Sequence, residues 1–156
     1  MSSKEQMLFN ACRQGDLDSV NTLLAEGADV NITDERGFTP LIIASYNGHL
    51  SVTKALIDAG ANINAQDSAG NTALMGVCFK GYPAIAELLL QHGADINMQH
   101  GNGGTALMFA TMFGRNDMVK LVLNYGADKN TREFRGLTAL DLAVQQGNVE
   151  AAEMLQ

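Results

Sequence analysis

The residue types that most often carry chemistry are few in this sequence: three histidines, two cysteines and a scatter of carboxylates. His92 and His100 stand eight residues apart with Asp95 between them, and imidazole and carboxylate are both metal ligands. We expect His92 at the end of a helix and His100 on a turn, so the spacing does not make the three side chains converge. The sequence therefore predicts no metal site, and we expect a structural role at a helix start for His49.

Cys12 and Cys78 are the only thiols and lie 66 residues apart. That separation equals two periods of a 33-residue repeat, and packed helices stand ~8–10 Å apart. Two units of stacking place the thiols well beyond the ~7 Å Cα separation that a disulfide tolerates. We predict two small buried side chains with neither a disulfide nor a metal between them.

Asp29, Asp95 and Asp128 recur at one position of the same repeat. Carboxylates spaced by a whole repeat form a row along the molecule and not a catalytic pair, so we expect them to accept hydrogen bonds within loops. The glycine-rich string HGNGG, residues 100–104, lacks the lysine of a phosphate-binding loop and is expected to form a turn. No nucleophile elbow, HExxH or CxxC motif is present, so the sequence predicts a protein that is not an enzyme and has no cofactor.

The elements that must position all these residues come from the repeat itself. The string GFTPLIIASYNGH, residues 37–49, returns as GNTALMGVCFKGY, GGTALMFATMFGR and GLTALDLAVQQGN at residues 70–82, 103–115 and 136–148. Glycines and asparagines of the intervening segments keep the same period: Gly27, Gly60, Gly93, Gly126, Asn31, Asn64, Asn97 and Asn130. A period shared by so many positions indicates a structure built of stacked units.

Each unit carries the signals of two short helices and a connecting loop. Thr39 precedes Pro40 and an apolar run, which predicts an N-cap followed by proline at the first helical position. The helix is expected to stop near Gly48, and a second apolar helix ends at each GAD or GAN sequence. Two such helices cannot bury their own apolar sides, so neighbouring units must stack into a solenoid with one continuous core.

Length and composition fit a single domain spanning residues 1–156, with 46% hydrophobic residues available for a core. The formal net charge of −7 disfavours phosphate backbones and anionic lipid, so we expect neither nucleic acid nor a membrane as partner. No stretch approaches the ~18 apolar residues that cross a bilayer, and the first residues do not read as a signal peptide. We therefore expect a cytoplasmic protein.

The string GFTPLIIASYNGHLSVTKALIDAGANINAQD, from Gly37, closely resembles the ankyrin repeat. The resemblance covers nearly the whole chain and implies an all-α ankyrin solenoid of stacked helix-turn-helix units with β-hairpin or loop crossovers. The five units are expected at about residues 4–33, 34–66, 67–99, 100–132 and 133–156. The chain departs from the family where a histidine usually follows TPL or TAL, because Ile42, Met75, Met108 and Asp141 stand there. We expect apolar packing to replace the polar network of that histidine.

Positions that vary in kind from unit to unit are those that packing does not fix, and they are candidates for binding. The resemblance implies that these positions line the concave groove of the solenoid and its rim, where partners of ankyrin proteins commonly bind. Six of the nine aromatic residues fall there, and exposed aromatic clusters are typical of interfaces, whereas Phe9 and Phe109 are expected in the core. The predicted partner-binding residues are Arg36, Phe38, Tyr46, Asn47, Phe79, Lys80, Met112, Phe113, Tyr125, Phe134 and Arg135.

These observations favour a protein–protein interaction module without catalytic activity, which binds another protein or a peptide segment and is a monomer when unbound. One alternative is a self-associating structural or scaffold protein, whose groove or open end binds a second copy. Another is an enzyme or small-molecule binder, which needs a convergent polar pocket that the sequence does not reveal. The fold alone does not choose among partners, because the binding surface and not the scaffold sets the function.

Overall fold

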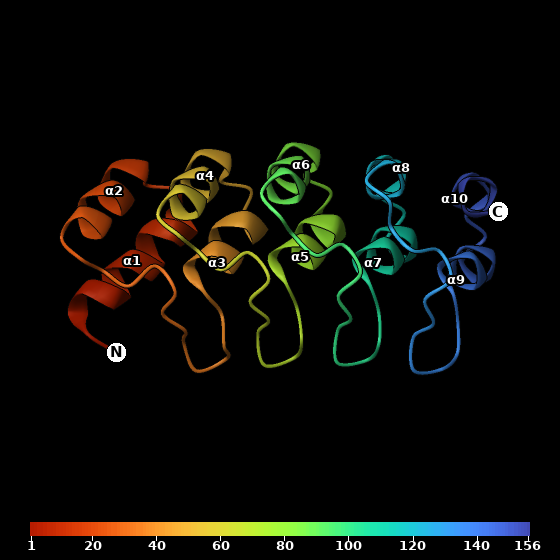
Figure 1. The fold of residues 1–156 in the computed structure, drawn as a ribbon, viewed down its shortest axis with the longest axis horizontal. Coiled ribbons are helices and arrows are strands. Elements are labelled where there is room, and N and C mark those ends of the chain that lie inside the picture. Colours follow the sequence, from red (N-terminus) through yellow and green to blue (C-terminus); the bar gives the residue numbers. More distant parts are fainter.

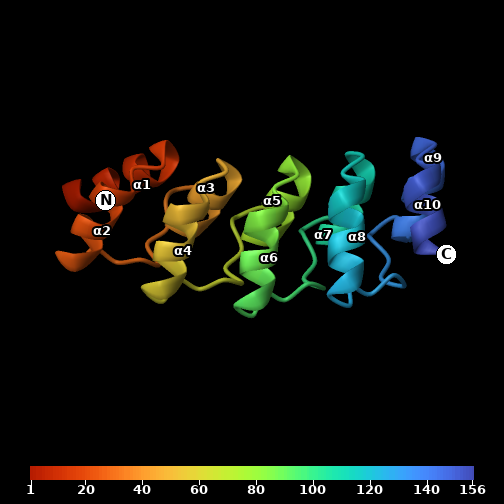
Figure 2. The ribbon, with the colours of Figure 1, turned by 90° about the horizontal axis from the view of Figure 1, so that it is seen from above.

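Five helix pairs stand side by side in a single row in the computed structural model, which describes residues 1–156 (Figure 1). The first helices of the pairs form one layer and the second helices form another, as the two views show (Figures 1 and 2). The first helices are α1 (Ser3–Gln14), α3 (Pro40–Tyr46), α5 (Ala73–Lys80), α7 (Ala106–Met112) and α9 (Ala139–Gln146). The second helices are α2 (Leu17–Ala25), α4 (Leu50–Asp58), α6 (Pro83–Gln91), α8 (Asn116–Asn124) and α10 (Val149–Leu155).

Threonine side chains start the first helices as the sequence predicts. Thr39 Oγ1 accepts a hydrogen bond from Ile42 N at 3.1 Å, and Pro40 occupies the first turn of α3, where its missing amide leaves no partner unsatisfied. Thr72, Thr105 and Thr138 cap their helices in the same way. These short helices gain little from propensity alone, so their stability depends on burying their apolar sides.

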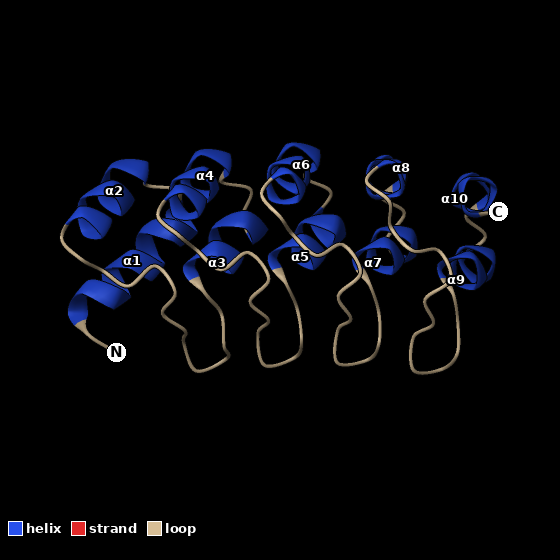
Figure 3. Cartoon of the chain, viewed as in Figure 1, coloured by secondary structure: helices blue, strands red, loops and turns tan.

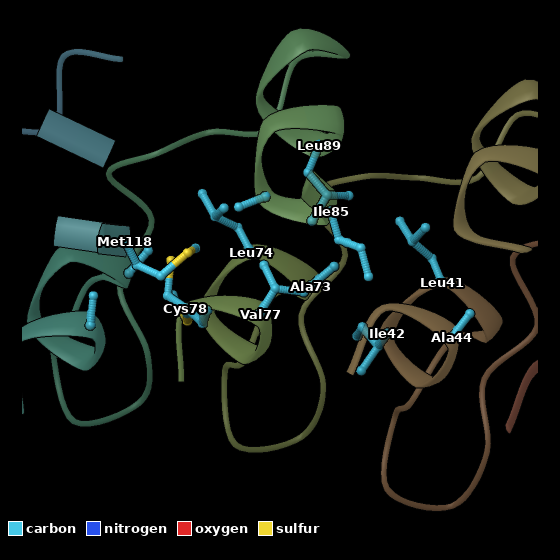
Figure 4. Close-up of a cluster of buried hydrophobic side chains, with 14 of the residues drawn as sticks. Leu41, Ile42, Ala44, Ala73, Leu74, Val77, Cys78, Ile85, Leu89 and Met118 are labelled. Atoms are coloured by element: carbon cyan, nitrogen blue, oxygen red, sulfur yellow. The ribbon is translucent and has the colours of Figure 1, made fainter. Parts of the chain in front are cut away.

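One hydrophobic core of 32 buried residues runs through the whole row. Figure 4 shows how it crosses unit boundaries: side chains of α3, α5, α6 and α8 meet in one cluster, with Leu74 and Val77 between Leu41 and Met118. The main helix contacts lie within a pair or between adjacent pairs, as in α3 with α5 and α5 with α7. Each unit therefore supplies part of the apolar surface that its neighbours bury.

The crossovers between units form hairpin-shaped loops and contain no strand (Figure 3). Within each loop a pair of residues closes the turn, as in Asp67 N donating to Asn71 O at 2.9 Å. Adjacent hairpins are joined by single backbone hydrogen bonds, for example from Ser68 N to Arg36 O at 2.9 Å and from Gly101 N to Ala69 O at 2.9 Å. The prediction of an all-α solenoid with hairpin or loop crossovers is confirmed.

Asparagines tie each loop after a second helix to the next loop along the row. Asn64 Oδ1 accepts from Asp95 N at 2.7 Å, and Asn64 Nδ2 donates to Gly93 O at 3.3 Å. Asn31 Oδ1 and Asn97 Oδ1 likewise accept a hydrogen bond from a backbone amide of the next loop. The recurring aspartates accept from amides two residues on, within their own loops, as expected from their spacing: Asp29, Asp95 and Asp128.

The position where the family usually carries histidine is apolar in the inner units. Met75 and Met108 are buried there, and Ile42 is buried as well. In the last unit Asp141 takes the same position and forms a capping box with Thr138, whose backbone amide donates to Asp141 Oδ2 at 2.9 Å. This hydrogen bond lowers the pKa of the Asp141 carboxyl. Apolar packing thus replaces the histidine in three units, and a capping carboxylate replaces it in the fourth.

None of the ten helices combines the length and the apolar character needed to cross a lipid bilayer.

Candidate protein-binding groove

The three histidines make separate local contacts. His49 Nε2 lies 2.9 Å from Arg13 O in the preceding unit, at the start of α4, as expected for a structural residue. His92 Nδ1 lies 2.9 Å from Leu88 O at the end of α6, and His100 Nδ1 accepts from Asn102 N at 3.1 Å inside its hairpin. No three histidine, cysteine or acidic side chains gather as a metal site would require.

Both cysteines are free and buried in the core. Burial raises the pKa of the Cys12 thiol to about 12, an effect that the charge of Arg13 opposes in part. Burial alone raises the pKa of the Cys78 thiol to about 12. At neutral pH both side chains are protonated, so neither is a nucleophile and both act as small apolar residues.

Three aromatic rings form a row across the first helices. The ring of Tyr46 stacks on that of Phe79 with centroids 6.3 Å apart, and Phe79 meets Phe113 edge to face at 4.5 Å. Lys80 Nζ lies 5.0 Å from the centre of the Tyr46 ring, a cation–π contact. Tyr46 and Phe113 are 42% and 47% exposed, so the row presents a substantial apolar surface to solvent. We call the surface of α3, α5 and α7 with their hairpins the groove face.

A hollow of about 510 Å³ lies on the groove face beside this row. Hydrophobic side chains supply most of its wall, and the α1 residue Arg13 borders it. Its lining residues are Arg13, Phe38, Ile42, Ile43, Tyr46, Asn47, Asp67, Asn71, Thr72, Ala73, Met75, Gly76, Phe79 and Phe109. A concave apolar site of this size is the kind of surface in which an anchor side chain of a ligand is buried.

Gly76 accounts for part of the space in the hollow. It lies in the interior of α5, where the equivalent residues of the neighbouring units are Ile43 and Phe109. A side chain as large as that of Ile43 or Phe109 at position 76 would occupy part of the hollow. Nearly all the other glycines have the positive φ that favours this residue, but Gly76 does not. Its presence in a helix interior is therefore not explained by the backbone conformation.

The structure brings together some of the predicted binding residues. Phe38, Tyr46, Asn47 and Phe79 line the hollow, and Lys80 and Phe113 contact the same aromatic row. Met112 is half-buried and packs against the core, so it contributes less surface than expected.

Other predicted residues lie elsewhere. Tyr125 follows α8, and its hydroxyl donates to Glu87 Oε1 of α6 at 3.2 Å, so it belongs to the second-helix layer and not to the groove. Phe134 and Arg135 are on the tip of the last hairpin, where Arg135 Nε donates to Glu133 Oε2 at 2.8 Å. This hydrogen bond lowers the pKa of Glu133. Arg36 borders a separate hollow between α1 and the first hairpin.

Sequence reasoning missed several residues of the hollow. Phe109, expected in the core, is half-buried, lines the hollow and meets His100 edge to face at 5.5 Å. Phe9, by contrast, is buried as expected. The sequence does mark Gly76, because the residues at the equivalent position of the adjacent units, Ile43 and Phe109, are large. What this difference means depends on which side of α5 the position faces. Arg13, Ile42, Ile43 and Met75 also line the hollow without having been singled out as binding residues.

Charge is divided unequally between the two sides of the molecule. The first helices and hairpins carry equal numbers of basic and acidic residues: Lys4, Arg13, Arg36, Lys80, Arg132 and Arg135 against Glu5, Asp34, Glu35, Asp67, Glu133 and Asp141. The second helices and the loops around them hold four basic residues and eleven acidic ones. The whole net charge of −7 therefore resides on the second-helix side, and the first-helix side as a whole carries no net charge.

Two protein-family models match the chain. One, described as ankyrin repeats in three copies, matches residues 8–100, and the other, described as ankyrin repeats in many copies, matches residues 89–143. A search of curated proteins found no match. Ankyrin repeats are generally protein–protein interaction modules. The matched ranges extend over most of the sequence and agree with the stacked helix pairs, so the chain belongs to the ankyrin-repeat family.

Proposed function

We propose that this protein binds a partner protein through the groove face and catalyses no reaction. The observation that supports the proposal most is the row of Tyr46, Phe79 and Phe113 beside an apolar hollow, with its two outer rings exposed. Aromatic side chains at the centre of an apolar surface are typical of the residues that contribute most to protein–protein affinity. The net charge of −7 lies on the second-helix side of the molecule and disfavours contact of that side with phosphate or anionic lipid.

The location that we propose is the cytoplasm, where unpaired thiols such as those of Cys12 and Cys78 stay reduced.

The groove is tested by crosslinking combined with a double substitution. Benzoylphenylalanine replaces Asn47 on the groove face or Ala84, an exposed residue of α6 on the opposite layer. After irradiation in a lysate of the source organism, we expect the probe at position 47 to capture a specific protein that the probe at 84 does not. The purified partner is then titrated against the wild type and against a variant with Phe79→Ser and Phe113→Ser, which should lose binding while its circular dichroism stays helical. Equal affinity for both would contradict the proposal.

A second candidate is self-association. Val144 on α9 and Val149 on α10 are exposed apolar residues in the last helix pair, and a second copy that packs on them would bury both. Sedimentation velocity over a range of concentrations separates the two functions, because a partner-binding monomer keeps a constant sedimentation coefficient. A dimer that Val144→Ser or Val149→Ser dissociates would favour self-association instead.

A further inference from the structure

We propose that the hollow beside Gly76 is a pocket for one bulky apolar side chain of an extended partner segment, and that carboxylates next to that side chain contact Arg13 and Lys80. This inference rests on the proposed function, and it names the chemistry of the segment that the groove face takes.

Glycine at position 76 leaves part of the pocket open. Glycine in a helix interior is unfavourable relative to alanine, and Gly76 has no positive φ that would require it. The single neighbour that a Cβ at this position would crowd is Tyr46 Cδ1, at 3.2 Å, on a ring that is 42% exposed. Replacing Gly76 by a residue like Ile43 or Phe109 of the adjacent units would place a side chain in the hollow and reduce its volume. Among the three inner units, only this one has glycine at the position.

The polar groups in the wall of the pocket already have partners. Asp67 Oδ1 accepts from Ala69 N and Asn71 N, and Asp67 Oδ2 accepts from Asn71 Nδ2 at 3.0 Å. Thr72 Oγ1 caps α5 by accepting from Met75 N. An occupant therefore does not need hydrogen-bonding groups at this point, and the side chains that surround it are apolar: Phe38, Ile43, Met75, Phe79 and Phe109. A tryptophan, phenylalanine or leucine side chain suits such a wall.

Unpaired cations flank the pocket. The structure holds two ion pairs, Lys54 with Asp58 and Arg135 with Glu133, and neither Arg13 nor Lys80 takes part in them. Arg13 donates only to Asn10 Oδ1, at 3.2 Å, and Lys80 lies over the Tyr46 ring. On the side of Arg13 away from the pocket, Glu5, Asp34 and Glu35 border the neighbouring hollow without reaching ion-pair distance.

The only carboxylate in the wall of the pocket is that of Asp67, whose oxygens accept bonds within its hairpin. Acidic residues beside the anchor would therefore find two cations that are in no ion pair, Lys80 on the groove face and Arg13 on the adjacent α1, whereas the second-helix side repels them.

An extended segment fits this surface better than a compact small molecule. The aromatic row continues from the pocket past Phe79 to Phe113, which is 47% exposed and lies beyond the lining of the hollow. A ligand confined to the hollow would leave Phe113 in water, and a chain that runs along the row would cover it. A second copy of this protein also has an exposed aromatic residue to offer, since Phe134 is 78% exposed on a hairpin tip between Glu133 and Arg135.

The test uses fluorescein-labelled pools of short synthetic peptides with randomised outer positions. The central residue is fixed as tryptophan, leucine or alanine, and its neighbours are fixed as aspartate, serine or lysine. Binding to the full-length protein is measured by fluorescence anisotropy at physiological salt. The variants are Gly76→Leu, which places a side chain in the pocket, and Lys80→Glu, which reverses a flanking charge. Their matched controls on the second-helix side are Ala84→Leu and Lys120→Glu.

We expect the pools with an apolar centre and acidic neighbours to bind about tenfold more tightly than those with alanine at the centre or lysine beside it. Gly76→Leu should remove that preference while keeping or raising the thermal midpoint, because a helix-forming residue replaces glycine. Lys80→Glu should weaken binding of the acidic pools by about fivefold and improve binding of the lysine pools. Both control variants should bind like the wild type.

Several outcomes would overturn the inference while leaving the proposed function in place. Unchanged binding by Gly76→Leu, with loss of binding by the Phe79→Ser and Phe113→Ser double variant, would mean that the groove binds without this pocket. Equal affinity for acidic and lysine pools would remove the role of Arg13 and Lys80. Binding of none of the pools would also overturn it, as would a dimer that Phe134→Ala or Gly76→Leu dissociates. Peptide binding that neither the pocket nor the groove variants alter would contradict both proposals.

Discussion

Phe79 and Phe113 meet edge to face across the boundary between α5 and α7, with ring centroids 4.5 Å apart. The two rings occupy different positions of the 33-residue repeat, so their contact is not a repeated feature of the solenoid. It joins two units at the surface that we propose for binding. We therefore expect substitution of either ring to change stability as well as affinity for the proposed partner, and the two effects need separate measurements.

The contact predicts a favourable coupling energy. In a double-mutant cycle of Phe79→Ala and Phe113→Ala, followed by urea denaturation, we expect the two losses of stability to be non-additive by about 0.5–1.5 kcal/mol. The same cycle with Phe79→Ala and Phe134→Ala serves as control, because Phe134 is on a hairpin tip and makes no ring contact with Phe79. A coupling that is equal in both cycles would show that the edge-to-face geometry contributes nothing.

Gly76→Ala is expected to stabilise the protein by about 0.5–1 kcal/mol, because alanine favours the helical conformation more than glycine does. The Tyr46 ring has to move only slightly to accept the new Cβ. Gly81→Ala, at the end of the same helix, provides the opposite result: Gly81 has φ +82°, and a side chain there costs about 1–2 kcal/mol. Urea denaturation of the three proteins measures both changes, and a loss of stability in Gly76→Ala would mean that Tyr46 cannot move aside.

Asp67→Ala should destabilise the protein by about 1–3 kcal/mol, since it leaves two backbone amides of a hairpin without their acceptor. Asp67 is only 9% exposed, and its Oδ1 accepts from Ala69 N at 2.9 Å and Asn71 N at 2.8 Å. Asp58→Ala is the matched control, because Asp58 is on the outer side of α4 in an exposed pair with Lys54. Equal effects of the two substitutions on the thermal midpoint would contradict the role of the hairpin hydrogen bonds.

The buried thiols predict a loss of stability in alkaline solution. Burial raises the pKa of Cys78 to about 12 in the folded protein, above the usual value of 9.0. Well below pH 9 the thiol is protonated in both states, so it does not make stability depend on pH there. As the pH rises from 9 towards 12, the unfolded chain loses the proton first, and the free energy of unfolding falls. Urea denaturation at pH 7 and pH 10.5 should show a larger decrease for the wild type than for Cys78→Ala, and equal decreases would mean that Cys78 ionises freely when folded.

The same burial predicts that neither Cys12 nor Cys78 reacts with a thiol reagent in the native state at pH 8. Modification should require unfolding and should follow the urea transition. Ser51→Cys, at an exposed position of α4, supplies an accessible thiol as the positive control. Rapid labelling of both native cysteines would show that the core around them opens easily.

The solenoid and its helix caps were predictable because they depend on local chemistry that recurs. A threonine marks the start of each of four first helices, because its hydroxyl accepts a hydrogen bond from the amide three residues on: Thr39, Thr72, Thr105 and Thr138. A glycine follows nine residues after each threonine, at the end of the helix. The 33-residue period supplied the stacking. Asn31 and Asn64, whose recurrence the sequence shows, form equivalent bridges between loops.

The binding surface was less predictable, because it depends on where a repeat position points. Tyr125 varies from unit to unit as Phe79 does, yet it is at the end of a second helix and contacts Glu87 in the other layer. Phe109 was expected in the core because of its position in the repeat. It is half-buried instead, and it lines the same hollow as Gly76. When the residues at one repeat position vary from unit to unit, packing does not fix the residue type at that position. This variation does not show which face of the solenoid the residue occupies.

The joints between units give the row a mechanical property. His49 reaches back to Arg13 O, Arg115 Nε donates to Phe79 O at 3.0 Å, and Asn148 Nδ2 approaches Thr111 O, so each such bridge spans one boundary and no more. We therefore expect small rotations at successive boundaries to add up, so that the row can bend along its length. A ligand that lies across α3, α5 and α7 would immobilise two boundaries at once and set the curvature of the stack. The bound protein would then bend less than the free one.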